Sequence, residues 1–172
     1  MIRLSAAFVF LVAAACASPT PADAAPGRGA VALDRGAAAM VAIAADEVMR
    51  TALAERDPAL LSHAFAGRAL QALRDQLRWM RERGLSLEER DPRRSLVSWD
   101  GARDEVVIQV EARERLVSMD QPDPPWSGTV HERWSRLAFV DDGWRVVDVR
   151  ELAPDQWALA LTTRVLARYG PL

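Results

Sequence analysis

The 172-residue chain has few of the side chains on which metal sites, disulfides and amine chemistry depend. It contains one cysteine, Cys16, and two histidines, His63 and His131, and all 22 of its basic residues are arginine because lysine is absent. One cysteine cannot form an intrachain disulfide, and so few soft ligands exclude an ordinary zinc site. The absence of lysine excludes a lysine Schiff base and a P-loop lysine. We therefore expect no metal and no cofactor.

A strong excess of charge of one sign is also missing. The chain has 22 basic and 24 acidic residues, which gives a formal net charge of −2. No overall basic excess is available to hold a phosphate backbone through the release of counterions, so a nucleic-acid partner is not expected. Half of the residues are hydrophobic. Composition and length together predict one ordinary globular domain.

The N-terminus has the pattern of an export signal. Arg3 precedes an uncharged stretch, residues 4–15, which is too short to span a bilayer as a mature helix. The run Ala13-Ala14-Ala15-Cys16 then resembles a bacterial lipobox, in which the cysteine thiol is lipidated. We predict a signal peptide over residues 1–15 and a lipid anchor at Cys16. The alternative is simple cleavage after an Ala-x-Ala triplet, which would give a secreted or periplasmic protein.

The segment after this cysteine has no large apolar side chain that could join a core. Residues 16–29 contain three prolines and two glycines. Such a composition is typical of a flexible tether. We therefore place the folded domain at residues 30–172 and expect the tether to hold it away from a membrane surface.

The first half of the folded part has a helical period. Apolar residues between positions 37 and 53 recur every three or four residues, and we assign this stripe to Met40, Val41, Ala44, Val48 and Ala52, with Arg50 outside it. Asp57-Pro58 predicts a second helix start, and the same spacing continues from Leu61 to Met80. Gly67 is a candidate break within this stretch, and Gly84 is its predicted end.

After Gly84 the period changes to two. Val106, Ile108, Val110 and Ala112 alternate with Glu105, Gln109, Glu111 and Arg113, as in a strand with one buried face. Further strands are predicted at about residues 94–99, 129–140 and 144–151, with a hairpin turn at Asp141-Asp142-Gly143. The three prolines in residues 120–128 predict a loop. The prediction is an α+β fold with N-terminal helices on a curved, antiparallel four-stranded sheet, and with a candidate C-terminal helix beyond Pro154.

Several of these stretches together resemble a known superfamily. They are the apolar positions of residues 57–77, Trp99-Asp100, the strand around Val110-Glu111-Ala112, Arg133-Trp134, and the run from Asp141 to Asp148. Over about residues 38–152 the chain resembles the NTF2-like (cystatin-like cone) superfamily. Within it, the chain is most similar to the intermembrane-space domain of plastid-division proteins and their bacterial relatives. The resemblance implies a cone-shaped domain. It leaves the activity open, because the superfamily includes both enzymes and non-catalytic binding modules.

Glu114 is the polar residue that the strand pattern makes most informative. It has the parity of Ile108 and Val110, so we expect it to point toward the apolar face. A carboxylate there could act as a general base. The alternative is an ion pair near the strand end with Arg136 or Arg115. Because Arg136 shares its parity with Trp134, we take Glu114, Arg136 and Trp134 as candidate cavity residues.

Three other residues are weighed as site candidates. His63 lies off the apolar stripe of its helix and is expected at the surface. His131 has the opposite parity to Trp134, so we predict that it faces outward. Trp126 follows Asp123-Pro124-Pro125 in the predicted loop, and an indole there is a candidate for an exposed partner contact or for a cap on the cone.

Three functions from different classes follow from these observations. The leading hypothesis is an exported, lipid-anchored NTF2-like module that binds a protein partner or a small apolar ligand at the cell envelope and catalyses nothing. The alternatives are a cone-cavity enzyme with Glu114 as general base and a structural homodimer whose sheets pack face to face. Residues 68–94 hold eight arginines against five acidic residues, so this side could contact anionic lipid or simply be a solvated face.

Overall fold

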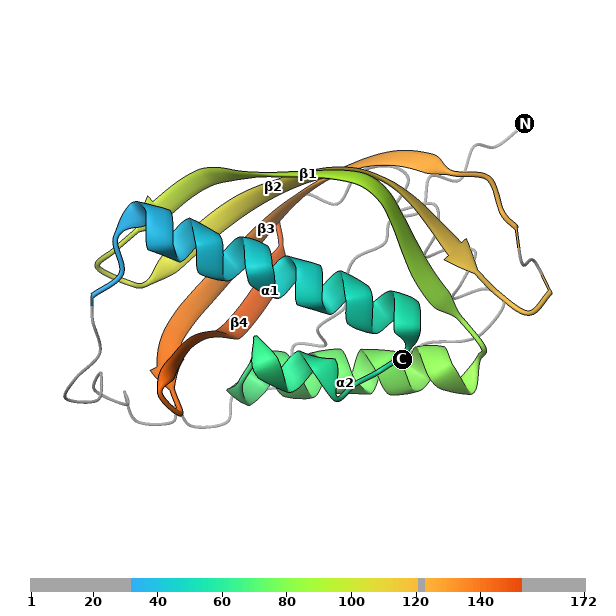
Figure 1. Cartoon of the computed structure of the whole chain (residues 1–172), viewed down its shortest axis with the longest axis horizontal. Coiled ribbons are helices and arrows are strands. Elements are labelled where there is room, and N and C mark those ends of the chain that lie inside the picture. Colours follow the sequence, from blue (N-terminus) through green and yellow to red (C-terminus); the bar gives the residue numbers. More distant parts are fainter. Residues whose placement is uncertain (1–31, 121–122, 153–172) are drawn as a thin grey trace, which may run out of the picture.

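The structure is a computed structural model that describes residues 32–120 and 123–152 (Figure 1). The predicted signal peptide, Cys16, the tether and the candidate C-terminal helix lie outside the described residues. The elements, in chain order, are α1 (Arg35–Glu55), the 3-10 helix η1 (Leu60–His63), α2 (Gly67–Glu82), β1 (Ser86–Asp100), β2 (Glu105–Val117), β3 (Ser127–Val140) and β4 (Gly143–Glu151). Within this part of the chain, no helix is long and apolar enough to cross a membrane.

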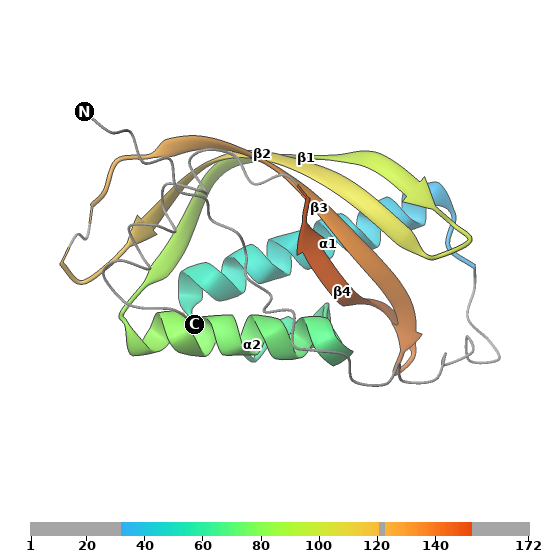
Figure 2. The ribbon, with the colours of Figure 1, turned by 180° about the vertical axis from the view of Figure 1, so that it is seen from behind.

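The strands form one antiparallel sheet in the order β1-β2-β3-β4, so each strand pairs with the next along the chain. The sheet is curved, and the helices cover its concave face. Figures 1 and 2 show β1 and β2 arching over α1, with α2 at the opposite side of the molecule from that arch. Helix α1 packs mainly on β1, and α2 packs mainly on β4. The predicted α+β fold, with helices on a curved four-stranded sheet, is confirmed.

Helix α1 buries a different face from the one that its apolar spacing predicted. Its N-cap is Asp34, whose side chain accepts a hydrogen bond from the Ala37 amide at 2.7 Å. The buried positions are mostly small apolar residues, together with two charged ones: Ala38, Ala42, Ala45, Asp46, Met49, Arg50, Ala52 and Leu53. Met40, which the prediction placed in the stripe, is 71% exposed. Alanine occurs on every side of this helix, so the apolar residues do not mark one face of it as the buried one.

The second helical stretch is divided where the sequence predicted a break. Gly67 has a φ of +53°, a conformation that glycine adopts without a steric penalty, and α2 begins at this residue. Just before it, the Ala66 amide donates to the Val146 carbonyl and the Val146 amide donates to the Ala64 carbonyl, both at 3.0 Å. These bonds attach the segment between η1 and α2 to β4.

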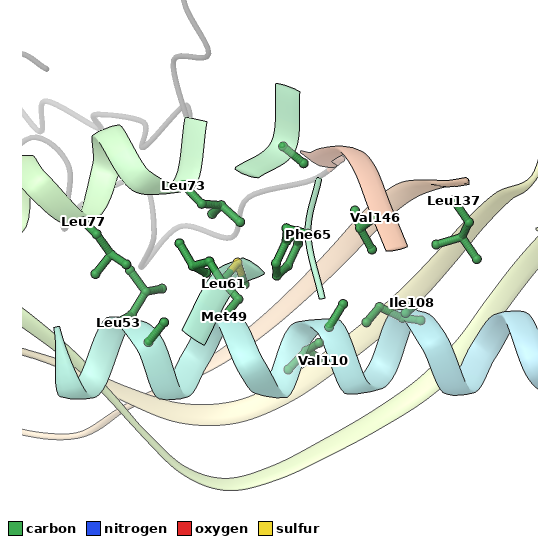
Figure 3. Packing of buried hydrophobic residues seen from close by; sticks show 14 of the residues in the cluster. Met49, Leu53, Leu61, Phe65, Leu73, Leu77, Ile108, Val110, Leu137 and Val146 are labelled. Carbon is green, nitrogen blue, oxygen red and sulfur yellow. The ribbon is translucent and has the colours of Figure 1, made fainter. Parts of the chain in front are cut away.

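The apolar core lies between the helices and the concave face of the sheet. Figure 3 shows Leu61 and Phe65 between α1, α2 and the strands, beside Leu77 and Val146. On β2 the predicted alternation is confirmed, because Val106, Ile108, Val110 and Ala112 are all buried. The apolar face of β2 is therefore the face of the sheet that packs against the helices.

Strand β1 is much longer than the predicted segment at residues 94–99. It begins at Ser86 and continues past Asp91-Pro92, where its register against β2 shifts. Proline cannot donate a ladder hydrogen bond, and here it is accommodated by a bulge and does not end the strand. The predicted β3–β4 hairpin turn is present, with the positive φ angles at Asp141 (47°) and Asp142 (64°).

Candidate functional site

Charged side chains meet in the interior, between α1 and the concave face of the sheet. Eight residues contribute, and each side chain is at most 10% exposed. They are Asp46 and Arg50 from α1, Glu89 and Arg94 from β1, Glu114 from β2, His131 and Arg133 from β3, and Glu151 from β4. We call this set the buried charge ring. Burial of so many charges is unusual unless each is paired, because an unpaired buried charge is very costly.

Two residues of α1, one turn apart, provide the helix side of the ring. The Asp46 carboxylate accepts a hydrogen bond from Arg94 Nε on β1 at 2.6 Å and also pairs with Arg133 on β3. Arg50 Nη1 lies 2.7 Å from Glu114 Oε1 on β2, and its Nε lies 3.5 Å from Glu89 Oε1 on β1. The helix is therefore joined by ion pairs to three strands of the sheet.

The remaining contacts connect the strands. Arg94 Nη2 lies 2.5 Å from Glu89 Oε2. His131 Nε2 lies 3.1 Å from Glu114 Oε2, and its Nδ1 contacts the Glu151 carboxylate. Charges of opposite sign thus alternate along the sequence of contacts Arg133, Asp46, Arg94, Glu89, Arg50, Glu114, His131, Glu151. The two ends, Arg133 and Glu151, are register partners across β3 and β4, which closes the ring.

The protonation of His131 decides whether the charges of the ring cancel. Burial works against its protonation, but the hydrogen bonds to Glu114 and Glu151 outweigh this effect and raise the pKa of His131 to about 9. Burial likewise opposes ionisation of Glu151, yet His131 and Arg133 hold the pKa of this carboxyl below its usual value. Burial lowers the pKa of Arg133, although an arginine stays charged in proteins. The contacts of the ring thus join four basic side chains to four acidic ones.

Glu114 points into the interior, as its parity predicted, and is 1% exposed. The prediction that Glu114 pairs with Arg136 or Arg115 is wrong, however. Arg136 is exposed on the outer face of the sheet, where its register partners are Glu105 and Asp148. Arg115 pairs with Glu88 at 2.7 Å and with Asp123.

The predicted orientations of His131 and Trp134 are reversed. The two residues do have opposite parity, but His131 is 4% exposed and faces the core. Trp134 lies partly exposed on the outer face, where its Nε1 donates to Glu105 Oε2 at 3.3 Å and the Arg150 guanidinium lies 5.0 Å from the ring centroid. The prediction assumed that the larger aromatic residue faces the core. His63 is exposed, as expected.

Trp126 is partly buried, and its role as a partner contact stays a prediction. The Arg115 guanidinium lies 4.5 Å from its ring centroid, and the Arg90 guanidinium lies 5.7 Å away. Cation–π contacts of this kind hold the indole against the ends of β1 and β2. Trp126 therefore stabilises the start of β3.

The ring itself has no opening to either of two hollows on the surface. One is lined by Asp91, Arg93, Glu111, Ala112 and Arg113, and the other by Pro58, Arg74, Arg78, Arg81 and Glu82. Neither lining includes a ring residue. Among the described residues, no group of three or more histidine, cysteine or acidic side chains is placed to hold a metal ion.

Six of the eight ring residues were missed from the sequence: Asp46, Arg50, Glu89, Arg94, Arg133 and Glu151. Two features of the sequence could have pointed to three of these residues. Asp46 and Arg50 are spaced i, i+4 on a helix rich in alanine, and Arg133 shares its parity with His131. Recognising them required knowing which faces of the helix and the strand are buried.

No protein-family model and no curated protein matches this sequence. Among solved structures, the intermembrane space region of the chloroplast protein ARC6 matches with a TM-score of 0.59 at 15% identity, over 70% of this chain and 98% of that chain. A protein of unknown function with a cystatin-like fold from Nostoc punctiforme PCC 73102 matches with a TM-score of 0.45 at 12% identity, over 70% of this chain and 93% of that chain. The first likeness shows a shared fold. This shared fold consists of two helices on a curved, four-stranded antiparallel sheet.

Proposed function

We propose that this chain is a non-catalytic module that binds a protein partner at the cell envelope, where a lipid on Cys16 anchors it. The observation that supports this function best is the buried charge ring. It fills the part of the cone where an enzyme of this shape would need an open pocket. Recognition is then left to the outer surface.

The alternative of a Glu114 enzyme has little support from the geometry. A general base must reach a proton on a bound substrate. Glu114 is 1% exposed, and its two carboxylate oxygens are engaged by Arg50 at 2.7 Å and His131 at 3.1 Å. A substrate could reach it only after α1 separated from the sheet.

A small apolar ligand is also a poor fit to the described residues. Pockets for such ligands are concave and lined mainly by apolar side chains. The concave side of this sheet holds the buried charge ring and the packed core. The two surface hollows are lined mainly by arginine, aspartate and glutamate. Of the two ligand classes that the sequence suggested, a protein partner is therefore favoured.

The outer face of the sheet has the features of a protein-binding surface. Trp134 lies there opposite Val107 in the register of β2 and β3, and Val130 on the same sheet is 45% exposed. Arg136 and Arg150 are exposed beside the indole. Tryptophan and arginine are the residue types that most often dominate binding energy at protein interfaces, usually inside a polar rim.

Photo-cross-linking in cells that make the protein tests this function. A photoreactive amino acid replaces Arg136 on the outer face in the complete chain, and the matched control replaces His63 on η1. We expect one discrete adduct from position 136, none from position 63, and loss of the adduct when Trp134→Ala is added. Unfolding curves of each variant verify that the loss does not come from unfolding.

Two outcomes would contradict the proposal. One is the absence of any adduct from position 136, and the other is an adduct that persists in the Trp134→Ala variant. An adduct with twice the mass of the chain would instead favour the homodimer, because a two-fold interface brings the same patch of both copies together.

A further inference from the structure

Helix α2 presents a row of exposed arginines along one of its solvent-facing sides. Arg74, Arg78 and Arg81 follow one another at spacings of four and three, so they share one face of the helix, and all three are exposed. The neighbouring face, about 100° around the helix, is apolar and buried through Ala69, Leu73, Leu77 and Met80. We call the three exposed residues the arginine face. With Pro58 and Glu82 they line an open hollow of about 530 Å³.

The acidic residues of α2 neutralise this face only in part. Asp75 pairs with Arg78 at 3.2 Å and also accepts hydrogen bonds from the Gln71 amide at 3.1 Å. Glu82 pairs with Arg83 at 3.5 Å. Among the described residues, Arg74 and Arg81 have no carboxylate partner. A positive surface therefore remains at both ends of the arginine face, on a chain whose net charge is −2.

We propose that the arginine face docks on the surface of an anionic phospholipid membrane. Guanidinium groups bind phosphate oxygens through two parallel hydrogen bonds, which makes arginine well suited to lipid phosphates. From Arg74 to Arg81 the helix rises by about 10 Å. The face is thus an open strip with three donors in a row and lacks the enclosure that would hold a single free anion. This shape fits several headgroups of a membrane.

The arginine face and the outer face of the sheet lie on different parts of the molecule. Figures 1 and 2 show that α2 and the arch of β1 and β2 lie on opposite sides of the molecule. The contact goes beyond the proposed function, because it requires neither the lipid on Cys16 nor the partner at Trp134.

Vesicle flotation tests the docking surface directly. The complete chain carries Cys16→Ser so that no acyl chain contributes, and it is mixed with vesicles of phosphatidylcholine alone or with about one third phosphatidylglycerol. The test variant is Arg74→Gln/Arg78→Gln/Arg81→Gln. The matched control is Arg35→Gln/Arg56→Gln/Arg103→Gln, three exposed arginines outside α2. All proteins share one N-terminal segment, so differences between them report on the substituted arginines.

We expect the partition onto phosphatidylglycerol vesicles to fall at least about tenfold in the test variant, because each arginine near an anionic surface contributes roughly fivefold. The control should stay within about twofold of the parent chain, since its arginines lie outside the docking surface. Binding of the parent chain should also weaken at high salt, where charges are screened within a few ångströms. An equal loss in both variants would overturn the proposal, and so would binding of inorganic phosphate by the arginine face without a preference for phosphatidylglycerol vesicles. Cross-linking at Arg136 is unaffected by either result, so failure here is distinct from failure of the proposed function.

Discussion

Arg50 on α1 and Glu114 on β2 form a buried ion pair, 2.7 Å between Nη1 and Oε1, that joins the helix to the centre of the sheet. The pair has a clear structural role. The buried face of α1 is formed largely by alanines, which would allow several rotations or shifts of the helix against the strands. Ion pairs are directional and costly to leave unmade, so they select one arrangement. We therefore expect the buried charge ring to fix the position of α1 on the sheet.

Removing one charge from the ring should destabilise the fold strongly. Glu114→Gln keeps the shape of the side chain but leaves Arg50 and His131 without their shared carboxylate. A broken buried pair costs about 3–5 kcal/mol. We expect the free energy of unfolding in urea to fall by about this amount.

The matched control for this change is Glu111→Gln, on the exposed outer face of the same strand. It should alter the free energy of unfolding by about 0.5 kcal/mol or less. A Glu114→Gln protein as stable as the parent chain would show that the ring is not needed to position α1. That result would also strengthen the case for Glu114 as a strained catalytic group.

The two faces of β2 should also differ in how much a substitution lowers the stability of the fold. Ile108 is 1% exposed, and Ile108→Ala should cost about 2–5 kcal/mol through lost burial and the cavity that remains. Arg113 is exposed on the other face, and Arg113→Ala should change stability by about 0.5 kcal/mol or less. Chemical denaturation measures both. Equal costs at the two positions would be incompatible with the parity of β2.

The sequence predicted the sheet better than the helix that packs on it. On β2, four apolar residues share one face and the other face is polar except at Val107, so one face stands out clearly. On α1, alanine occurs all round, and the face that meets the sheet is selected by Asp46 and Arg50, whose partners lie on other elements. These partners are distant in the sequence, so no local spacing of residues predicts them.

The lack of a local signal also explains why the orientations of His131 and Trp134 on β3 were predicted in reverse. His131 and Trp134 differ in parity, but parity alone does not say which of them faces the core. Size favoured Trp134, whereas the structure places His131 inside because Glu114 and Glu151 are there to share its charge. A polar residue is stable in the interior when its partners are already present.

The anchor at Cys16 is tested by changing that residue alone. If Cys16 is lipidated, Cys16→Ser should move the protein from the membrane fraction to the soluble fraction after a high-salt wash, which removes contacts made through charge alone. The free energy of unfolding should stay the same, because Cys16 precedes the predicted domain. An intact mass that corresponds to an unmodified chain beginning at Ser18 or later would contradict the anchor.

The buried charge ring also predicts how stability depends on pH. The pKa of His131 rises from 6.5 in the unfolded chain to about 9 in the fold, so its contribution is complete below pH 6.5 and is lost as the pH rises through 9. This shift corresponds to about 3 kcal/mol. The pKa of Glu151 is lowered from 4.5, so its contribution is complete above that pH and is lost as the pH falls through its folded value. Denaturation curves should therefore show maximal stability between about pH 4.5 and 6.5 and a decline toward pH 9.5.

His131→Gln should remove the alkaline decline, whereas His63→Gln, at an exposed position, should keep it. A decline unchanged in His131→Gln would show that another group titrates.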